Sequence, residues 1–426
     1  MNIFKDTLAF FRGEKQYTFY FQSLKLSDSL LSLWFFIMQL FEIKARKNGN
    51  DLFLKEVKKT FNFKKGFLFG SARSSIYAIL KSLDYEDGSE VLVTGFTCEV
   101  VPNAIINAGY LPLYVDINLE NYCMDPAIVE QIITDKTRAI IIQHTFGIPA
   151  QINELIKIAQ KYNLFVIEDC AVSLGSKYNG KLTGTFGDAA VLSFELSKTI
   201  TSCWGGMLFL NTNKDNAINK MEIFYKNVPE QKKLQKLRTL FQLGISGILY
   251  RPKLYILGKY IVAIFFKLKI FLPSTREVEI NGGLPPNYLV KLSRKQSIIL
   301  RRQYLRLEEL NHIKAHIKTQ YINNFSNYLD SKLIKFIIKK EVVLIRFPIL
   351  TDDYSSVRNW FASNNIELGF WFTSPLSSKE IDHKVFKYYS GMCPNSEMIS
   401  KKIINLPLSK NSAEMIIKNR LLLNYF

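Results

Sequence analysis

Short apolar runs alternate with amphipathic segments through the chain from residue 66 onwards. Runs such as EVLV at 90–93, RAIIIQ at 138–143 and LFVIED at 164–169 are typical of buried parallel strands. The segment IYAILKSL at 76–83 instead places apolar residues three and four apart, as a helix does. Because strands and helices that alternate form βαβ units, we expect an α/β fold with a doubly wound, mostly parallel sheet.

The pattern changes towards the carboxyl end. Residues 335–350, KFIIKKEVVLIRFPIL, predict strands, and residues 353–365 predict a helix, which together form an α+β arrangement separate from the parallel sheet. A long helix is expected before them, beginning after the Pro285–Pro286 pair. Residues 289–426 are therefore assigned to a long helix followed by a small carboxyl-terminal domain.

Two further segments flank the large domain, which we assign to 61–215. Residues 1–60 form an N-terminal extension whose apolar run at 29–41 has 13 uncharged residues, fewer than the ~20 that span a bilayer. This run predicts a buried or interfacial helix. Residues 216–288 form an apolar, basic insertion in which apolar clusters alternate with single lysines and arginines.

Composition and charge limit the classes of function. With 48% hydrophobic and 22% charged residues the chain is globular, and its net charge of +19 implies attraction to anionic partners such as nucleotides or acidic lipids. No RNA-binding, zinc-finger or basic-zipper signature is present, so no nucleic-acid partner is expected. The five cysteines are odd in number and form no CxxC pair, which fits the cytoplasm and predicts no metal site.

Candidate chemistry lies at the ends of two predicted strands. LFVIED ends in Asp169, and the strand AAVLSF delivers Ser193 and, after a short turn, Lys198. Pyridoxal phosphate chemistry needs such a pair: a lysine that binds the aldehyde as a Schiff base and a carboxylate that keeps the pyridine nitrogen protonated. Taken singly, Asp169 is equally interpretable as a helix cap or a magnesium ligand, and Lys198 as a surface lysine.

Several motifs together resemble the DegT/DnrJ/StrS family of pyridoxal-phosphate-dependent nucleotide-sugar aminotransferases. The resemblance implies fold type I, with a small α+β domain after the large one, and a homodimer. It also implies catalytic roles for Asp169 and Lys198, and Lys198 argues against the related dehydratases, which carry histidine there. The motifs are GFTCEVVPNAI at 95–105, QHTFGIPAQI at 143–152, EDCA at 168–171, GTFGDAAVLSF at 184–194 and MCPNSEMISKKIINLPLS at 392–409.

The resemblance also assigns cofactor-binding positions. Ser193 and the backbone at Ala72 and Arg73, where a helix begins, are expected to bind the phosphate, since unpaired N–H groups and the helix dipole favour an anion there. The Arg73 side chain is either a further phosphate ligand or a surface residue. His144, at a strand end, is either a site-lining residue or a structural one.

Several positions depart from the family pattern, and among them Ala72 and Arg73 replace the usual glycine and threonine of the phosphate loop. Cys98 stands where a ring stacks on the cofactor, with Phe96 two residues away, and Val172 stands where a hydrogen-bonding side chain faces the cofactor's phenolic oxygen. The asparagine that reaches the partner subunit's cofactor phosphate is replaced by Leu289, so Asn287 is the candidate for that role.

We therefore predict an aminotransferase that moves an amino group from an amino acid, plausibly glutamate, to a nucleotide-linked keto sugar in surface-glycan or amino-sugar biosynthesis. Two alternatives remain: a catalytically weakened relative with a regulatory or scaffold role, and an aminotransferase acting on a non-sugar carbonyl. For residues 241–273 two interpretations also stay open. They either dock on an anionic membrane surface as basic amphipathic helices or pack as an ordinary insertion.

Overall fold

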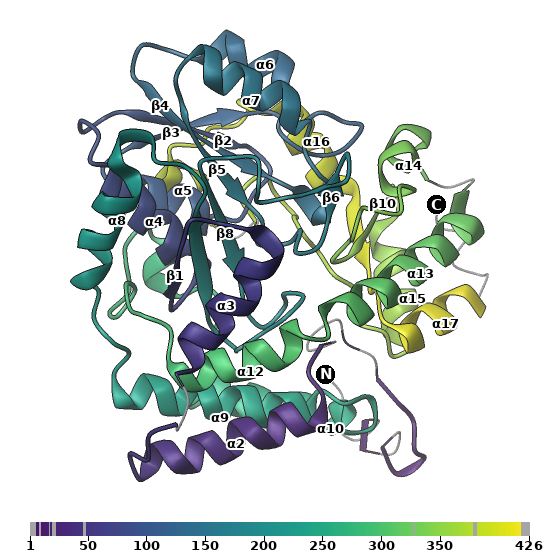
Figure 1. Cartoon of the computed structure of the whole chain (residues 1–426). Helices are drawn as coiled ribbons and strands as arrows, with labels where there is room; N and C mark the ends of the chain where they lie inside the picture. The colour runs from purple at the N-terminus through teal and green to yellow at the C-terminus, as the bar shows by residue number, and fades with distance from the viewer. Residues whose placement is uncertain are drawn as a thin grey trace.

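The computed structural model describes residues 6–7, 10–16, 18, 23–45, 48–326, 329–377 and 381–418. A seven-stranded sheet lies at its centre, with the strand order β1-β9-β8-β5-β4-β2-β3 (Figure 1). All neighbours from β3 to β8 are parallel, and β9 runs antiparallel between β8 and β1. The predicted mostly parallel sheet is confirmed. The strands are β1 (Lys65–Phe69), β2 (Glu90–Thr94), β3 (Leu111–Val115), β4 (Thr137–Gln143), β5 (Phe165–Asp169), β8 (Ala189–Ser193) and β9 (Gly206–Leu210).

Both faces of the sheet are buried under helices, which explains why its strands are continuous apolar runs. Alternate side chains pack on opposite sides: Val91 and Val93 contact one core, and Leu92 contacts another. One face is covered by α4 (Ala72–Leu83), α5 (Val100–Asn107) and α8 (Ala217–Lys226), and the other by α3 (Gly49–Phe61), α6 (Pro126–Ile132) and α7 (Ile152–Lys161).

The small domain is built on the antiparallel pair β10 (Phe347–Leu350) and β11 (Ile403–Leu406). The expectation of strands across 335–350 is correct only for β10. Residues 335–337 belong to a helix, because Asp330 caps it by accepting a hydrogen bond from the Lys332 N–H and because Leu333 and Ile337, four apart, are both buried. The helices of this domain are α13 (Leu307–Phe325), α14 (Ser331–Ile337), α15 (Tyr354–Ser363), α16 (Pro394–Lys402) and α17 (Lys410–Lys418).

The long helix expected after residue 289 is two helices, α12 (Arg294–Tyr304) and α13. The chain leaves helical geometry at Arg306, where φ is −110° and ψ is 9°. From this position the Arg306 guanidinium reaches the buried carboxylate of Asp28 at 2.5 Å. The break therefore places Arg306 in contact with a segment that lies far away in the sequence.

The N-terminal extension and the insertion pack together as one helical layer, which consists of α2 (Leu26–Leu40), α9 (Lys233–Leu249) and α10 (Pro252–Lys267). Helix α9 contacts both α2 and α10, and α12 joins α2 to α3. The layer lies at the end of the molecule opposite α6 and α7 (Figure 1). Within the described ranges, no helix combines the length and the apolar character needed to cross a bilayer.

Candidate active site

A cavity of about 760 Å³ opens at the carboxyl edge of the sheet, with walls from the large domain, the small domain and the helical layer. Ligands of α/β sheets bind at this edge. The cavity collects nearly all of the predicted site residues, and Asn287 alone among them does not line it. The predicted residues in its wall are Ala72, Arg73, Cys98, Asp169, Val172, Ser193 and Lys198.

Asp169 and Ser193 reach the cavity because each is the last residue of a buried strand. Asp169 ends β5 and pairs with Val191 in the parallel neighbour β8, which ends two residues later at Ser193. A tight turn follows, in which the Lys198 N–H donates to the Glu195 carbonyl at 3.1 Å. The turn brings Lys198 back to the same edge of the sheet as Asp169.

Burial shifts the two charged groups in opposite directions. It raises the pKa of the Asp169 carboxyl, although a hydrogen bond from the Ala171 N–H and the positive charge of Lys198 act against the shift. Burial lowers the pKa of Lys198, opposed by the carboxylates of Glu195 and Asp169. A lysine whose neutral amine is favoured is suited to nucleophilic attack on a carbonyl.

The first turn of α4 forms the anion-binding end of the cavity. Ser71 caps the helix by accepting a hydrogen bond from the Ser74 N–H at 3.2 Å. The backbone N–H groups of Ala72 and Arg73 belong to the first turn of α4, where N–H groups have no hydrogen-bond acceptor within the helix. Gly206 makes the close approach of β9 possible, because a Cβ there would lie 2.4 Å from the Ala72 nitrogen.

The Arg73 side chain is buried, and its guanidinium is engaged by other groups of the protein. Its guanidinium donates to Glu279 of α11 (Glu277–Ile280) at 2.5 Å and to the Ser274 carbonyl at 2.8 Å, and it lies 5.7 Å from the centre of the Trp204 ring. Both members of the Arg73–Glu279 pair are buried. The insertion is thereby fixed to the anion-binding end of the cavity.

Two residues of the small domain enter the site without having been predicted. The Trp371 ring lies 4.5 Å from Lys198 Nζ, and the buried Arg346 guanidinium lies 3.4 Å from the centre of the same ring. The aromatic run GFWF at 369–372 was the only signal in the sequence. It gave no indication of a contact with Lys198, because the two segments belong to different domains.

The helical layer supplies a further part of the wall, through Tyr255 and Lys259 of α10. Lys259 forms an ion pair with Asp6 at 2.8 Å and donates to the side chain of Gln16, another cavity residue, at 3.0 Å. Burial raises the pKa of the neighbouring Glu367 carboxyl, which lies 3.4 Å from the Tyr255 hydroxyl. The insertion and the extension therefore shape the part of the cavity that faces away from the sheet.

Sequence comparison agrees with this geometry. The model of the DegT/DnrJ/EryC1/StrS aminotransferase family matches residues 45–254 and 265–418. The chain belongs to this family. It is 42% identical to GDP-perosamine synthase of Escherichia coli O157:H7 over 137 residues, which are 32% of this chain and 38% of that protein. The chain thus matches less than half the length of this curated relative.

Solved structures of the family share the fold. Helicobacter pylori PseC, an aminotransferase involved in the biosynthesis of pseudoaminic acid, gives a TM-score of 0.71 at 18% identity over 96% of this chain and 98% of that one. The putative sugar aminotransferase Spr1654 of Streptococcus pneumoniae in its PLP form gives 0.67 at 17% identity over 90% and 94%. The expected fold type I with a small carboxyl-terminal domain is confirmed.

Of the departures from the family pattern, Ala72, Arg73, Cys98 and Val172 line the cavity and Leu289 does not. The Cys98 thiol donates to Glu99 at 3.2 Å, and burial together with the Glu99 charge raises its pKa, so the thiol stays protonated. Phe96 is fully buried in the core of the small domain, edge-on to Phe372, and is absent from the cavity wall. It does not replace the family's stacking ring.

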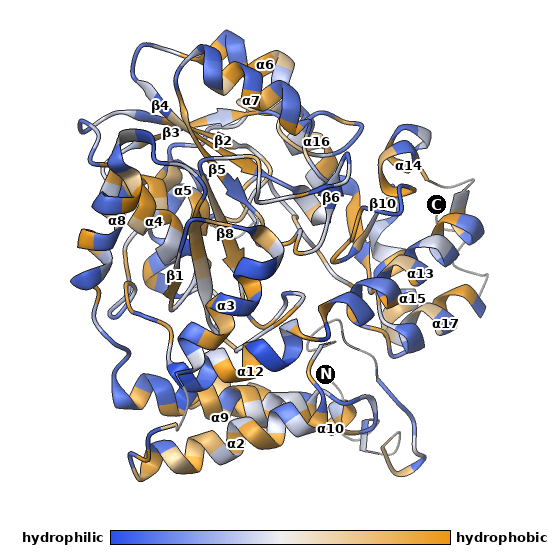
Figure 2. Ribbon diagram, viewed as in Figure 1, coloured by the Kyte–Doolittle hydropathy of each residue, from blue (hydrophilic) through white to orange (hydrophobic). Residues whose placement is uncertain are grey.

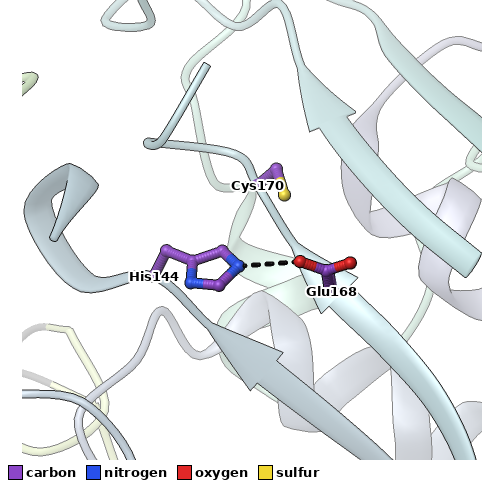
Figure 3. Close-up of side chains that lie close together, drawn as sticks. All are labelled: His144, Glu168 and Cys170. Atoms are coloured by element: carbon purple, nitrogen blue, oxygen red, sulfur yellow. Dashed lines mark hydrogen bonds and ion pairs between the residues drawn. The ribbon is translucent and has the colours of Figure 1, made fainter. Parts of the chain in front are cut away.

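His144 is a structural residue of the site's framework. It is fully buried, and its Nδ1 accepts a hydrogen bond from the Ala150 N–H at 3.1 Å, which leaves the ring proton on Nε2 to face Glu168 at 3.2 Å (Figure 3). Glu168 also accepts hydrogen bonds from the backbone N–H groups of Gly184, Phe186 and Gly187. These bonds hold the GTFGD loop onto β5.

The same group has the composition of a metal site, because Cys170 joins His144 and Glu168 with all three ligand atoms within 4.8 Å of one another (Figure 3). Its donors are already engaged, however. Both Glu168 oxygens and both imidazole nitrogens have hydrogen-bond partners, and burial raises the pKa of the Cys170 thiol well above its usual value. We interpret the group as an anchor for the loop.

Asn287 lies outside the cavity of its own chain. It is exposed and adopts a φ of 59°, in the left-handed region, between the Pro285–Pro286 pair and the buried Val290. Its predicted contact with a partner subunit remains a prediction.

Proposed function

We propose that this protein is a pyridoxal-phosphate-dependent aminotransferase that moves an amino group from an amino acid, plausibly glutamate, to a nucleotide-linked keto sugar in surface-glycan or amino-sugar biosynthesis. The observation that carries the proposal is the meeting of Asp169, Lys198 and the first turn of α4 in one cavity. The retention of both Asp169 and Lys198 in this cavity favours an enzyme over a regulatory relative.

The residues present fit this cofactor. Ser193 and the N–H groups of Ala72 and Arg73 would bind its phosphate, and the buried indole N–H of Trp204, a cavity residue without an acceptor in the described structure, matches an anion or carbonyl on a bound group. Asp169 would hold a proton at the pyridine nitrogen, and this cation would in turn stabilise the buried carboxylate. When bound, the cofactor supplies an aldehyde and an electron-withdrawing ring.

Lys198 has two roles in the proposal. Its amine, favoured in the neutral form by burial, would attach the aldehyde carbon. Once released by the amino donor, the same Nζ would act as the base that moves a proton between the substrate's α-carbon and the cofactor's C4′ carbon. The Trp371 ring, 4.5 Å away, would hold the lysine over the reacting atoms and exclude water.

The cationic side chains of the cavity suit a nucleotide diphosphate. Arg346, Arg358 and Lys259 all line it, which gives a phosphate-bearing substrate several cations. The net charge of +19 would attract such a substrate from solution. We further propose a cytoplasmic homodimer, with peripheral contact at the inner membrane face.

Covalent attachment tests the proposal. Protein supplied with pyridoxal phosphate should absorb visible light, and borohydride reduction followed by peptide mapping should place the label on Lys198. Lys198→Ala should lose both the absorbance and amino transfer from glutamate to a nucleotide-linked keto sugar. Lys259→Ala, which removes another lysine from the same cavity, should keep the absorbance. A label on another lysine, or none, would refute the assignment.

A further inference from the structure

Helix α2 has its polar side buried. Asp28, Ser29 and Ser32 are fully buried, and Asp28 forms ion pairs with Arg302 at 2.9 Å and with Arg306. The Ser32 hydroxyl donates to the Leu240 carbonyl of α9 at 2.8 Å. These contacts fix which side of α2 faces the protein.

Two glycines of α9 bring α2 close on that side. A Cβ at Gly244 would lie 2.6 Å from the Leu33 side chain, and a Cβ at Gly247 would meet the Ser29 hydroxyl. The rotation of α2 about its axis is therefore set by hydrogen bonds, ion pairs and close packing. The helix cannot turn its apolar side inward without breaking them.

The outer side of α2 is apolar. Trp34 is 58% exposed and Phe41, just after the helix, is 73% exposed. Steps of three or four residues place the exposed side chains on one face of the helix. A surface helix in water shows the opposite arrangement, with charged and polar residues outside. The exposed residues are Leu26, Leu30, Trp34, Ile37, Leu40 and Phe41.

Helix α10 adds a second apolar stripe to the same helical layer. The exposed apolar residues of α10 and Leu268, directly after the helix, are spaced by seven, three and four positions; Ile264 is 53% exposed and Leu268 63% exposed. Figure 2 shows the apolar colouring of α2 and α10 at the end of the molecule opposite α6 and α7. Exposed apolar surface of this extent marks an interaction site. The stripe consists of Leu254, Ile261, Ile264 and Leu268.

Charge distinguishes the possible partners. Residues 231–276 contain ten lysines and arginines and no aspartate or glutamate. Lys253, Lys267 and Lys269 are exposed beside the α10 stripe. In a two-fold dimer this surface would face its own copy, so that like charges would meet across the interface. A bilayer with anionic headgroups offers apolar chains and negative charge together.

We propose that α2 and α10 form a peripheral docking face for a bilayer that contains anionic lipids. Trp34 and its apolar neighbours enter the headgroup region, and the lysines of α10 lie at the lipid phosphates. With 15 and 16 residues the two helices are shorter than the ~20 needed to cross a bilayer, so they lie in its surface.

The test is sedimentation of the full-length protein with phosphatidylcholine vesicles, with and without phosphatidylglycerol, at low and high salt. We expect binding to the anionic vesicles that weakens as salt rises. The double variant Leu30→Ser/Trp34→Ser should bind at least tenfold more weakly. Ile223→Ser, at an equally exposed apolar position on α8, should bind as the wild type does. Ile261→Ser/Ile264→Ser tests the α10 stripe independently, should the first variant fold poorly.

Two further measurements complete the test. The lipid-dependent shift in tryptophan emission should disappear in Trp34→Phe while vesicle binding persists. Light scattering after size-exclusion chromatography should give the same oligomeric state for the wild type and both double variants. Equal binding to neutral vesicles, or undiminished binding by both double variants, would overturn the proposal. Dissociation of an oligomer by either double variant would also overturn it and identify the face as an interface between copies.

Discussion

At the scale of single residues, burial favours the uncharged forms of both Asp169 and Lys198. Ionising the Asp169 carboxyl in this buried site is costly, and a positively charged ring nitrogen beside it would offset that cost. The site is therefore more favourable with a cationic ligand than without one. Cys98 and Val172 line the same cavity as this pair.

Val172 tests whether the site has adapted to a missing hydrogen bond. Val172→Gln should restore a donor near the cofactor's phenolic oxygen and tighten cofactor binding by no more than about tenfold, since a hydrogen bond contributes ~0.5–1.5 kcal/mol. Absorbance titration of the cofactor-free protein measures this change. Val172→Leu, which adds volume without a donor, is the control. Weaker binding by Val172→Gln would mean that the wall is built around valine.

Lys314 predicts a pH dependence of stability. Its ammonium donates to Thr199 at 3.2 Å, next to Lys198, and burial lowers its pKa to about 8. Because the unfolded chain holds this proton up to a pKa near ~10.4, the folded state binds fewer protons between these values and gains stability as pH rises. Relative to Lys314→Met, the wild type should gain about 2 kcal/mol between about pH 7 and about pH 9.5.

Denaturant unfolding of both proteins across this pH range measures the difference. Lys335→Met, on the exposed side of α14, controls for the loss of a lysine as such. A difference between the wild type and Lys314→Met that stays constant with pH would show that Lys314 is solvated in the folded protein.

At the scale of elements, α11 is held against the anion-binding end of the cavity by the ion pair between Glu279 and Arg73. Arg73 and Glu279 are 206 residues apart and both buried, so loss of one partner leaves an unpaired charge in the interior. Glu279→Gln should destabilise the protein by about 3 kcal/mol. Glu277→Gln, exposed on the same short helix, should change stability by less than about 0.5 kcal/mol.

Thermal unfolding with and without pyridoxal phosphate gives a second readout for Glu279→Gln. The cofactor's phosphate would supply an anion near Arg73, so the loss of stability should shrink when the cofactor is bound. Limited proteolysis should cut the insertion around α11 faster in Glu279→Gln than in Glu277→Gln. Equal proteolysis and equal stability of the two variants would contradict a fixing role for the pair.

At the scale of the whole molecule, the question is whether the site is complete within one chain. Asn287 is exposed and outside its own cavity, so it can influence cofactor binding only through a second copy. Asn287→Ala should weaken cofactor binding several-fold, as the loss of one hydrogen bond does, and leave the oligomeric state unchanged. Asn281→Ala, exposed in the same segment, is the matched control. Light scattering and cofactor titration report the two properties separately, and unchanged affinity would remove Asn287 from the site.

The sequence by itself determined the fold class and the central pair. Apolar strand runs separated by amphipathic helices specify a parallel sheet, and the carboxyl ends of its strands share one edge. Asp169 follows from that rule as the last residue of β5, and Lys198 as a residue that comes after β8 and a short turn. The role of the first turn of α4 was also predictable, because the first turn of any helix has N–H groups that are free to bind an anion.

Only the tertiary structure decided the contacts between distant segments. These contacts are those of Trp371 with Lys198, of Arg306 with Asp28 and of Arg73 with Glu279. They depend on how the small domain, α2 and the insertion pack against the large domain, and the local sequence does not predict that packing. The sequence also left two environments open for the helix at 29–41, buried or interfacial. Its rotation, with Asp28 inward and Trp34 outward, is set by ion pairs and glycine contacts with α9 and α12 that form only when three remote segments meet.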